Sequence, residues 1–224
     1  MKDRIAAAAQ RAGRDAAEIT LVAVAKTHPA TVVSAAAEAG LTDFGENRIE
    51  EALPKMASVR AAGVEDHLRW HMIGHVQSRK AREVAHAGFV LVHSVNSFKL
   101  AERLSRHAAG SGRAQPILLE CNVSGEASKA GFAAWGDPSG WEALLPDAEQ
   151  ILKLPGVRVQ GLMTMAPIVR ESEAARPFFA RLRELRDYLA QRLPDADWRA
   201  LSMGMTDDFE AAIAEGATIL RIGR

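Results

Sequence analysis

Short apolar runs alternate with amphipathic, alanine- and charge-rich stretches along the whole chain. The apolar runs have the length of strands and contain many β-branched residues, and they do not alternate strictly between apolar and polar positions. Such runs are typical of parallel strands that are covered on both faces. The pattern predicts eight strands, at Ile19–Lys26, Asp43–Gly45, Arg69–Ile73, Phe89–His93, Ile117–Val123, Arg158–Met163, Ala200–Met203 and Thr218–Arg221.

The stretches between these strands have the periodicity of helices that bury one face. An alanine-rich segment at the N-terminus predicts one extra helix before the first strand. The longest irregular stretch, Gly125–Gly140, is expected to be a loop over one end of the sheet. The helices are predicted at Pro29–Ala39, Asn47–Arg60, within Gln77–Ala87, and at Ser97–Ala109, Trp141–Lys153, Glu173–Arg192 and Asp207–Glu215.

Eight parallel βα units are expected to close into a barrel. An open, doubly wound sheet would produce the same alternation. The strand count, the even spacing and the absence of a Gly-x-Gly-x-x-Gly turn after the first strand favour the barrel. No linker or change of composition divides the chain, so we predict a single α/β domain, a (β/α)8 TIM barrel over residues 1–224. Functional groups of such barrels lie at the C-terminal ends of the strands.

Composition narrows the classes of function. Lys+Arg and Asp+Glu both number 28, and this balance argues against a nucleic-acid-binding protein. The single cysteine, Cys121, excludes an internal disulfide framework and a cysteine-based zinc site, and it indicates a reducing compartment, the cytoplasm. No cluster of His, Asp and Glu has metal-ligand spacing. Neither a signal peptide nor an apolar run of membrane-spanning length is present, so we expect a soluble protein without a membrane partner.

The first candidate for chemistry is Lys26, which follows five small apolar residues at the end of the first predicted strand. At a barrel mouth, partial burial would lower the pKa of the amine and let it attack an aldehyde. The alternative is a lysine whose stem packs on the barrel while its charge stays in water.

The second candidate is the pair of loops after the last two strands, which contain Ser202, Gly204 and Thr206 in one and Gly223 in the other. Barrels commonly bind phosphate between these two loops, through backbone N–H groups that glycine leaves uncovered. The alternative is a loop that simply leads into a capped helix.

A lysine that faces a phosphate site suggests a phosphorylated aldehyde held as a Schiff base, and pyridoxal 5′-phosphate (PLP) has both groups. Arg221 would then face the pyridine nitrogen and disfavour its protonation, which makes the cofactor a weaker electron sink. The alternative for Arg221 is a salt bridge to a barrel carboxylate such as Glu46.

Other polar residues near strand ends are interpreted as structural. His71 and His93 are placed to act as general bases, but histidines in a barrel wall more often have satisfied hydrogen bonds. Cys121 is interpreted as a small buried hydrophobic residue.

Nine segments of the chain carry a further pattern: Ala25–Pro29, Phe44–Asn47, Trp70–Gly74, His93–Val95, Asn122–Glu126, Lys129–Phe132, Gly161–Met165, Leu201–Asp208 and Arg221–Gly223. Together they resemble the successive motifs of the pyridoxal phosphate homeostasis protein family, from about Ile19 to the end of the chain. The resemblance implies the barrel of the alanine racemase N-terminal domain, known as PLP fold type III. It also implies covalently bound PLP, a role in vitamin B6 and amino-acid homeostasis, and no established reaction.

The resemblance also implies roles for individual residues. Lys26 would be the Schiff-base lysine, Arg221 would face the pyridine nitrogen, and no other residue would be catalytic. The other cofactor-binding positions would be Asn47, Met163, Ser202, Met203, Gly204 and Gly223, of which Ser202 and the two glycines would contact the phosphate. Three positions depart from the family pattern: His75 often is proline, Arg79 often is asparagine, and a small hydroxyl residue usually stands where Arg224 does.

Three functions follow as alternatives. The first is a monomeric PLP carrier that serves PLP-dependent apo-enzymes. The second is a PLP-dependent amino-acid racemase or decarboxylase, for which the chain lacks an obvious second base because its sole tyrosine, Tyr188, lies in a predicted outer helix. The third is a sugar-phosphate enzyme that uses the phosphate site without a Schiff base.

Overall fold

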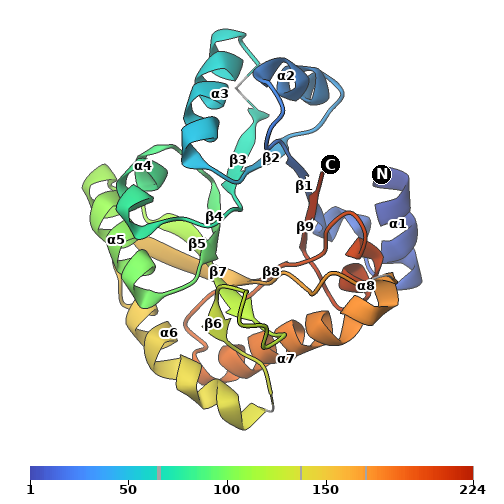
Figure 1. Cartoon of the computed structure of the whole chain (residues 1–224), viewed down its shortest axis with the longest axis vertical. Helices are drawn as coiled ribbons and strands as arrows, with labels where there is room; N and C mark the ends of the chain where they lie inside the picture. The colour runs from blue at the N-terminus through green and yellow to red at the C-terminus, as the bar shows by residue number, and fades with distance from the viewer. Residues whose placement is uncertain (65–66, 137, 170, 224) are drawn as a thin grey trace.

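The computed structural model describes residues 1–64, 67–136, 138–169 and 171–223, and its strands close into a parallel barrel (Figure 1). Eight strands form the ring β1-β2-β3-β4-β5-β7-β8-β9, which closes because β9 pairs with β1 and β4 with β5. The predicted barrel is therefore confirmed. The strands are β1 (Thr20–Val24), β2 (Asp43–Glu46), β3 (Arg69–Met72), β4 (Leu91–Val95), β5 (Gln115–Asn122), β6 (Phe132–Ala133), β7 (Val157–Met163), β8 (Ala200–Ser202) and β9 (Ile219–Ile222).

Helices surround the ring in chain order, and the extra N-terminal helix packs against the last one (Figure 1). None of the helices in the described ranges is both long and apolar enough to cross a lipid bilayer. The α-helices are α1 (Lys2–Arg11), α2 (Ala30–Glu38), α3 (Ile49–Ala61), α4 (Ala81–His86), α5 (Phe98–Ala108), α6 (Leu145–Leu152), α7 (Arg176–Arg192) and α8 (Phe209–Ala214). Short 3₁₀ segments are η1 (Ala16–Glu18), η3 (Ser78–Lys80), η4 (Ala109–Ser111), η5 (Pro138–Leu144) and η6 (Ser172–Ala175).

Two details of the sheet differ from the prediction. β4 extends to Val95, beyond the predicted end at His93, because the polar side chains of His93 and Ser94 are buried with hydrogen-bond partners. The loop predicted at Gly125–Gly140 contains β6, a two-residue strand that pairs with the end of β5. Two residues are too few to produce a recognisable pattern along the sequence.

The barrel interior is unusually polar. A small apolar layer fills part of it, made of Val22, Leu91, Leu118, Met163 and Ile219. In most barrels of this kind bulky branched side chains fill all the layers. Here the remaining inward positions hold the buried polar side chains of Asp43, His71, His93, Glu120, Ser202 and Arg221. The larger apolar core lies outside the ring, between strands and helices.

Candidate functional site

Lys26 stands at the C-terminal mouth of the barrel, on the turn that follows β1. The strand ends at Val24, two residues earlier than predicted, because Thr27 turns the chain with a φ of 65°. Among the described residues, Thr27 is the one non-glycine residue with a positive φ, which is rare for a β-branched side chain. Its hydroxyl donates a hydrogen bond to the Lys26 carbonyl at 2.6 Å. Lys26 itself is exposed, which agrees with the alternative that its charge stays in water and not with a partly buried amine.

A buried ion pair supports the backbone beside Lys26. Lys55 on α3 donates from Nζ to Oε1 of Glu46 and to the carbonyl oxygen of Ala25, both at 2.6 Å. The two side chains are 8% and 0% exposed. Burial raises the pKa of the Glu46 carboxyl, and the hydrogen bond and charge of Lys55 oppose this shift.

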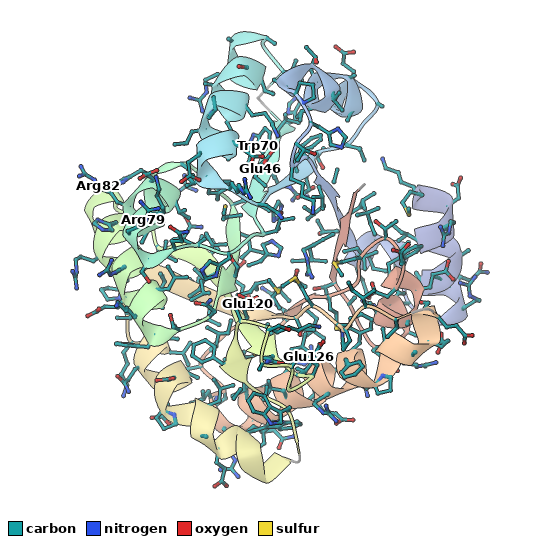
Figure 2. The ribbon with its side chains drawn as sticks, in the orientation of Figure 1. Glu46, Trp70, Arg79, Arg82, Glu120 and Glu126 are labelled. Atoms are coloured by element: carbon teal, nitrogen blue, oxygen red, sulfur yellow. The ribbon has the colours of Figure 1, made fainter. Side chains whose placement is uncertain are left out.

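Lys55 carries no prediction from the sequence, and Glu46 is the predicted alternative partner of Arg221. In the structure, Glu46 instead pairs with Lys55, and Figure 2 places Glu46 beside α3, on the side of the barrel opposite Glu120. A signal was present in the sequence: Lys55 shares the buried face of its helix with Ala52, Met56 and Val59. A lysine inside an apolar stripe requires a buried partner.

The loops after β8 and β9 are tied to each other and to β1. The Thr206 hydroxyl donates to the Gly223 carbonyl at 3.1 Å and lies 3.3 Å from the Gly223 nitrogen. Gly204 has a φ of 92°, and a Cβ there would lie 2.6 Å from the Ala212 Cβ. A Cβ at Gly223 would lie 2.6 Å from the Cβ of Val24. These contacts hold two glycine-containing backbone segments together near Lys26, as a phosphate site requires.

Arg221 lies under these loops, with 5% of its surface exposed. Its guanidinium donates to the Ser202 hydroxyl at 2.6 Å and to the Thr164 carbonyl at 2.8 Å. Burial lowers the pKa of Arg221 to about 10, against the opposing charges of Asp208 and Glu120. The group therefore remains a cation at neutral pH and can only donate hydrogen bonds.

Three further side chains continue from Ser202 across the barrel interior. Ser202 Oγ lies 2.8 Å from Nδ1 of His93, whose Nε2 lies 3.0 Å from Nδ1 of His71. His71 Nε2 lies 2.9 Å from Oδ1 of Asp43. Burial holds the pKa of His93 well below its ordinary value, and the charge of Arg221 acts in the same direction. Both histidines have hydrogen-bond partners inside the barrel, as the structural interpretation predicted.

Asp43 gives this arrangement a testable pH dependence. Burial alone would raise its pKa, but hydrogen bonds from His71, Arg69 and Thr42 outweigh burial and lower it from 3.8 to about 2. A depressed carboxyl pKa stabilises the fold above the unfolded-state pKa and loses this effect as the pH falls through the folded value. We expect Asp43 to contribute about 2 kcal/mol to the free energy of unfolding at pH 6, lost between about pH 4 and pH 2.

The measurement is denaturant unfolding of the wild type and Asp43→Asn across this pH range. The difference between the two proteins should shrink by about 2 kcal/mol between pH 6 and pH 2. A difference that stays constant with pH would contradict the assignment.

Of the other predicted cofactor residues, Met163 and Asn47 lie in the barrel interior or at its mouth, and Met203 does not. Met163 is fully buried inside the barrel and pairs in register with Ser202. Asn47 lies at the mouth, where its backbone touches Gly74 so closely that a Cβ on that glycine would collide with it. Met203 is also fully buried, but its side chain packs in the shell between strands and helices. The side chain of Met203 therefore points away from the barrel interior.

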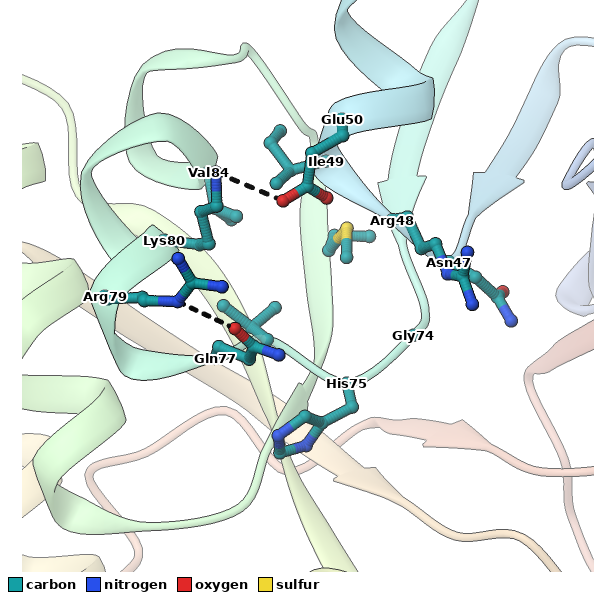
Figure 3. A pocket seen from close by; sticks show the side chains of 12 residues that line it. Asn47, Arg48, Ile49, Glu50, Gly74, His75, Gln77, Arg79, Lys80 and Val84 are labelled. Carbon is teal, nitrogen blue, oxygen red and sulfur yellow. Dashed lines mark hydrogen bonds and ion pairs between the residues drawn. The ribbon is translucent and has the colours of Figure 1, made fainter.

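A cavity of about 410 Å³ opens beside Asn47, between the start of α3 and the loop after β3 (Figure 3). Both family departures on this loop, His75 and Arg79, line it. Arg79 donates from Nε to the Gln77 side chain at 2.9 Å. Arg79 adds a positive charge to the lining of this cavity. The third departure, Arg224, lies outside the described residues.

Glu120 is a further buried group at the site. It projects from β5 into the barrel and is 4% exposed, and burial raises the pKa of its carboxyl against the charge of Arg221. Within the part of the chain that the structure describes, its Oε2 has no hydrogen-bond partner. The same part contains no group of three or more His, Cys, Asp or Glu residues arranged to hold a metal ion. Cys121, next to Glu120, is buried as predicted.

Comparisons with known proteins agree with this geometry. The family model described as alanine racemase, N-terminal domain, matches residues 1–224. The chain is 47% identical over 220 residues to the pyridoxal phosphate homeostasis protein of Pseudomonas aeruginosa, covering 98% of this chain and 88% of that protein. It is 40% identical over 221 residues to the protein of the same name from Aquifex aeolicus, covering 99% and 91%.

A solved structure extends the comparison to three dimensions. PipY of Synechococcus elongatus, determined with PLP bound, superimposes with a TM-score of 0.80 at 37% identity, over 98% of this chain and 97% of PipY. The barrel, the full-length match to the family model and the identity to these relatives lead to one conclusion. The chain belongs to the pyridoxal phosphate homeostasis protein family, which has the barrel of the alanine racemase N-terminal domain.

Proposed function

We propose that this protein binds PLP as a Schiff base on Lys26, with the phosphate between the loops after β8 and β9. The observation that carries the proposal is the position of Arg221. Its buried guanidinium lies directly below the two glycine-containing loops, and Lys26 follows the neighbouring strand β1. PLP bound to PipY, a relative of 37% identity, supports the same ligand here.

The residues present fit this cofactor. At Gly204 and Gly223 a Cβ would collide with Ala212 and Val24, so the close packing of these two loops requires glycine, and Thr206 adds a hydroxyl beside Gly223. Asn47 follows β2 at the mouth, and Met163 ends β7 inside the barrel. Bound PLP supplies an aldehyde for the lysine and a ring that can accept electrons from a substrate.

Arg221 determines how strongly that ring would accept electrons. A cationic hydrogen-bond donor that faces a pyridine nitrogen requires an unprotonated nitrogen with a free lone pair. A neutral ring withdraws electrons less strongly than a pyridinium ring. Arg221 therefore favours holding the cofactor over chemistry on an amino acid.

We infer a homeostatic role for the protein. As a cytoplasmic monomer it would bind PLP reversibly, buffer its concentration and supply it to PLP-dependent apo-enzymes, without a catalytic turnover of its own. The chain's one tyrosine, Tyr188, is on α7, where its ring packs against Trp141. Tyr188 therefore belongs to the packing between strands and helices, and not to the barrel interior, where the second base of a racemase would be needed.

A reconstitution experiment tests this function. Purified protein loaded with PLP is incubated with a panel of L-amino acids, and D-isomers and carbon dioxide are measured alongside transfer of PLP to a PLP-dependent apo-enzyme. We expect a yellow protein, activation of the apo-enzyme and no sustained turnover. Continued formation of a D-amino acid or carbon dioxide would replace the carrier with the enzyme alternative. A colourless protein that takes up no PLP would contradict the proposal itself.

A further inference from the structure

Five buried side chains from five different strands are joined in series inside the barrel. Asp43, His71, His93, Ser202 and Arg221 come from β2, β3, β4, β8 and β9, and each is at most 5% exposed. The four links between them measure 2.9, 3.0, 2.8 and 2.6 Å. We call this series the barrel chain. It connects the guanidinium under the phosphate loops with a carboxylate toward the opposite end of the barrel.

The two ends of the barrel chain determine where every proton lies. Arg221 can only donate, so Ser202 Oγ accepts from it and is free to donate its own proton to His93 Nδ1. At the other end Asp43 is ionised and can only accept, so His71 Nε2 carries a proton.

The remaining contact joins the two imidazoles. If His93 donates from Nε2 to His71 Nδ1, each donor in the series faces an acceptor. The reverse arrangement needs a charged His71 and a proton on His93 Nδ1, which would leave the Ser202 proton without an acceptor in the series. It would also add a second buried cation, whose partner Asp43 already pairs with Arg69, and burying this further charge carries a desolvation cost. All the hydrogen bonds therefore run in one direction, from Arg221 to Asp43.

We propose that Asp43, His71 and His93 are positioning residues, which act through Ser202 to fix the orientation of the Arg221 guanidinium toward the bound cofactor. The proposal rests on the proposed function, because it assigns these residues to the group that faces PLP. It also changes the role of Ser202. The single hydroxyl proton of Ser202 is used toward His93, so the hydroxyl stabilises Arg221 and is not a donor to the phosphate.

The hydrogen bonds of the barrel chain position the Arg221 guanidinium by restricting the rotation of the Ser202 hydroxyl. Arg221 is held by the Ser202 hydroxyl on one guanidinium nitrogen and by the Thr164 carbonyl on another. A serine hydroxyl can rotate and donate in several directions, and only the acceptor at His93 Nδ1 keeps its lone pairs turned toward Arg221. Asp43 in turn determines the tautomer of His71, because it accepts from Nε2. A substitution of Asp43 on β2 or His93 on β4 therefore alters the orientation of Arg221, although neither residue contacts Arg221 directly.

The first test needs no cofactor. Protein labelled with ¹⁵N-histidine is examined by NMR between pH 6 and pH 8, and His71→Gln and His93→Gln assign the two buried rings. We expect both His71 and His93 to be neutral and protonated on Nε2. A ring protonated only on Nδ1, or a charged ring at either position at pH 7, would overturn the proposal. Because PLP is absent, this outcome is independent of the proposed function.

The second test measures the effect on the cofactor. In His93→Leu the barrel chain is broken, and we expect PLP to bind about tenfold more weakly, as for loss of one hydrogen bond to a charged group. We also expect the absorbance maximum of the loaded protein to shift. His93→Gln keeps one donor and one acceptor and should recover most of the affinity. The matched control is His86→Leu, an exposed histidine on α4, which should change neither quantity.

The outcomes separate the two proposals. Unchanged affinity and absorbance in a folded His93→Leu variant would overturn the positioning role while PLP binding stands. If His93→Leu does not fold, the NMR tautomers of the unmodified protein still decide. Failure of the wild type to bind PLP would refute the proposed function, and the tautomers would show whether the barrel chain exists without it.

Discussion

Replacing Lys26 by alanine is expected to abolish covalent PLP while leaving the fold intact. Lys26 is exposed on a turn, and the buried contacts nearby are made by other residues, so its loss removes no packing. The phosphate loops and Arg221 remain, so the variant should still bind PLP, but reversibly and weakly. Treatment with borohydride followed by mass spectrometry should detect one fixed PLP on the wild type and none on the variant.

The matched control is Lys99→Ala, which removes an exposed lysine from the first turn of α5. We expect this variant to retain one PLP per chain on Lys26. If Lys26→Ala is still labelled to the same extent, another lysine forms the bond and the proposed site is wrong. If neither the wild type nor the control is labelled, PLP is not held covalently.

Replacing Lys55 by methionine should produce the largest loss of stability. The substitution keeps the length and much of the apolar volume of the side chain but leaves the Glu46 carboxylate buried without its cation. Breaking a buried ion pair from one side costs about 3–5 kcal/mol. It also removes the hydrogen bond to the Ala25 carbonyl, which precedes Lys26. Urea unfolding at pH 7 measures this loss.

Two further variants test the cause of that loss. Glu46→Leu combined with Lys55→Met removes both charges, and we expect it to recover most of the lost free energy of unfolding. Arg199→Ala removes an ion pair whose arginine side chain is 91% exposed, and it should leave the free energy of unfolding almost unchanged. A double variant as unstable as Lys55→Met would show that packing, and not the unpaired carboxylate, explains the effect.

The strands illustrate how much of the fold the sequence could predict. The alternation of short strand-length runs with helical stretches located all eight barrel strands, because strands covered on both faces contain consecutive apolar residues, as Ile117–Leu119 do in β5. Strand ends were less predictable. β1 stops at Val24 because of the turn at Thr27, whose positive φ depends on surrounding contacts and not on its own preference. β6 has two residues, pairs with β5 and has no pattern of its own.

The candidate site also contains residues that the sequence could predict and residues that depend on tertiary contacts. Lys26, Gly204, Arg221 and Gly223 could be proposed from the sequence because residue type and position at a strand end carry information in a barrel. Their common location is confirmed by the pairing of β1 with β9 and of β9 with β8. Their contacts with PLP remain a proposal. Lys55 was missed, since its partners Glu46 and Ala25 are brought to it only by folding.

The sequence by itself determined the family, the barrel and the residues at the mouth, because periodicity, glycine placement and ordered motifs are local properties of the chain. Only the tertiary structure decided the exposure of Lys26, the ion pair of Lys55 and the barrel chain. Asp43 and Arg221 are far apart along the chain and are joined by His71, His93 and Ser202 only when five strands meet around one interior. The direction of these hydrogen bonds depends on the contacts between the five strands, and the spacing of residues along the sequence does not encode those contacts.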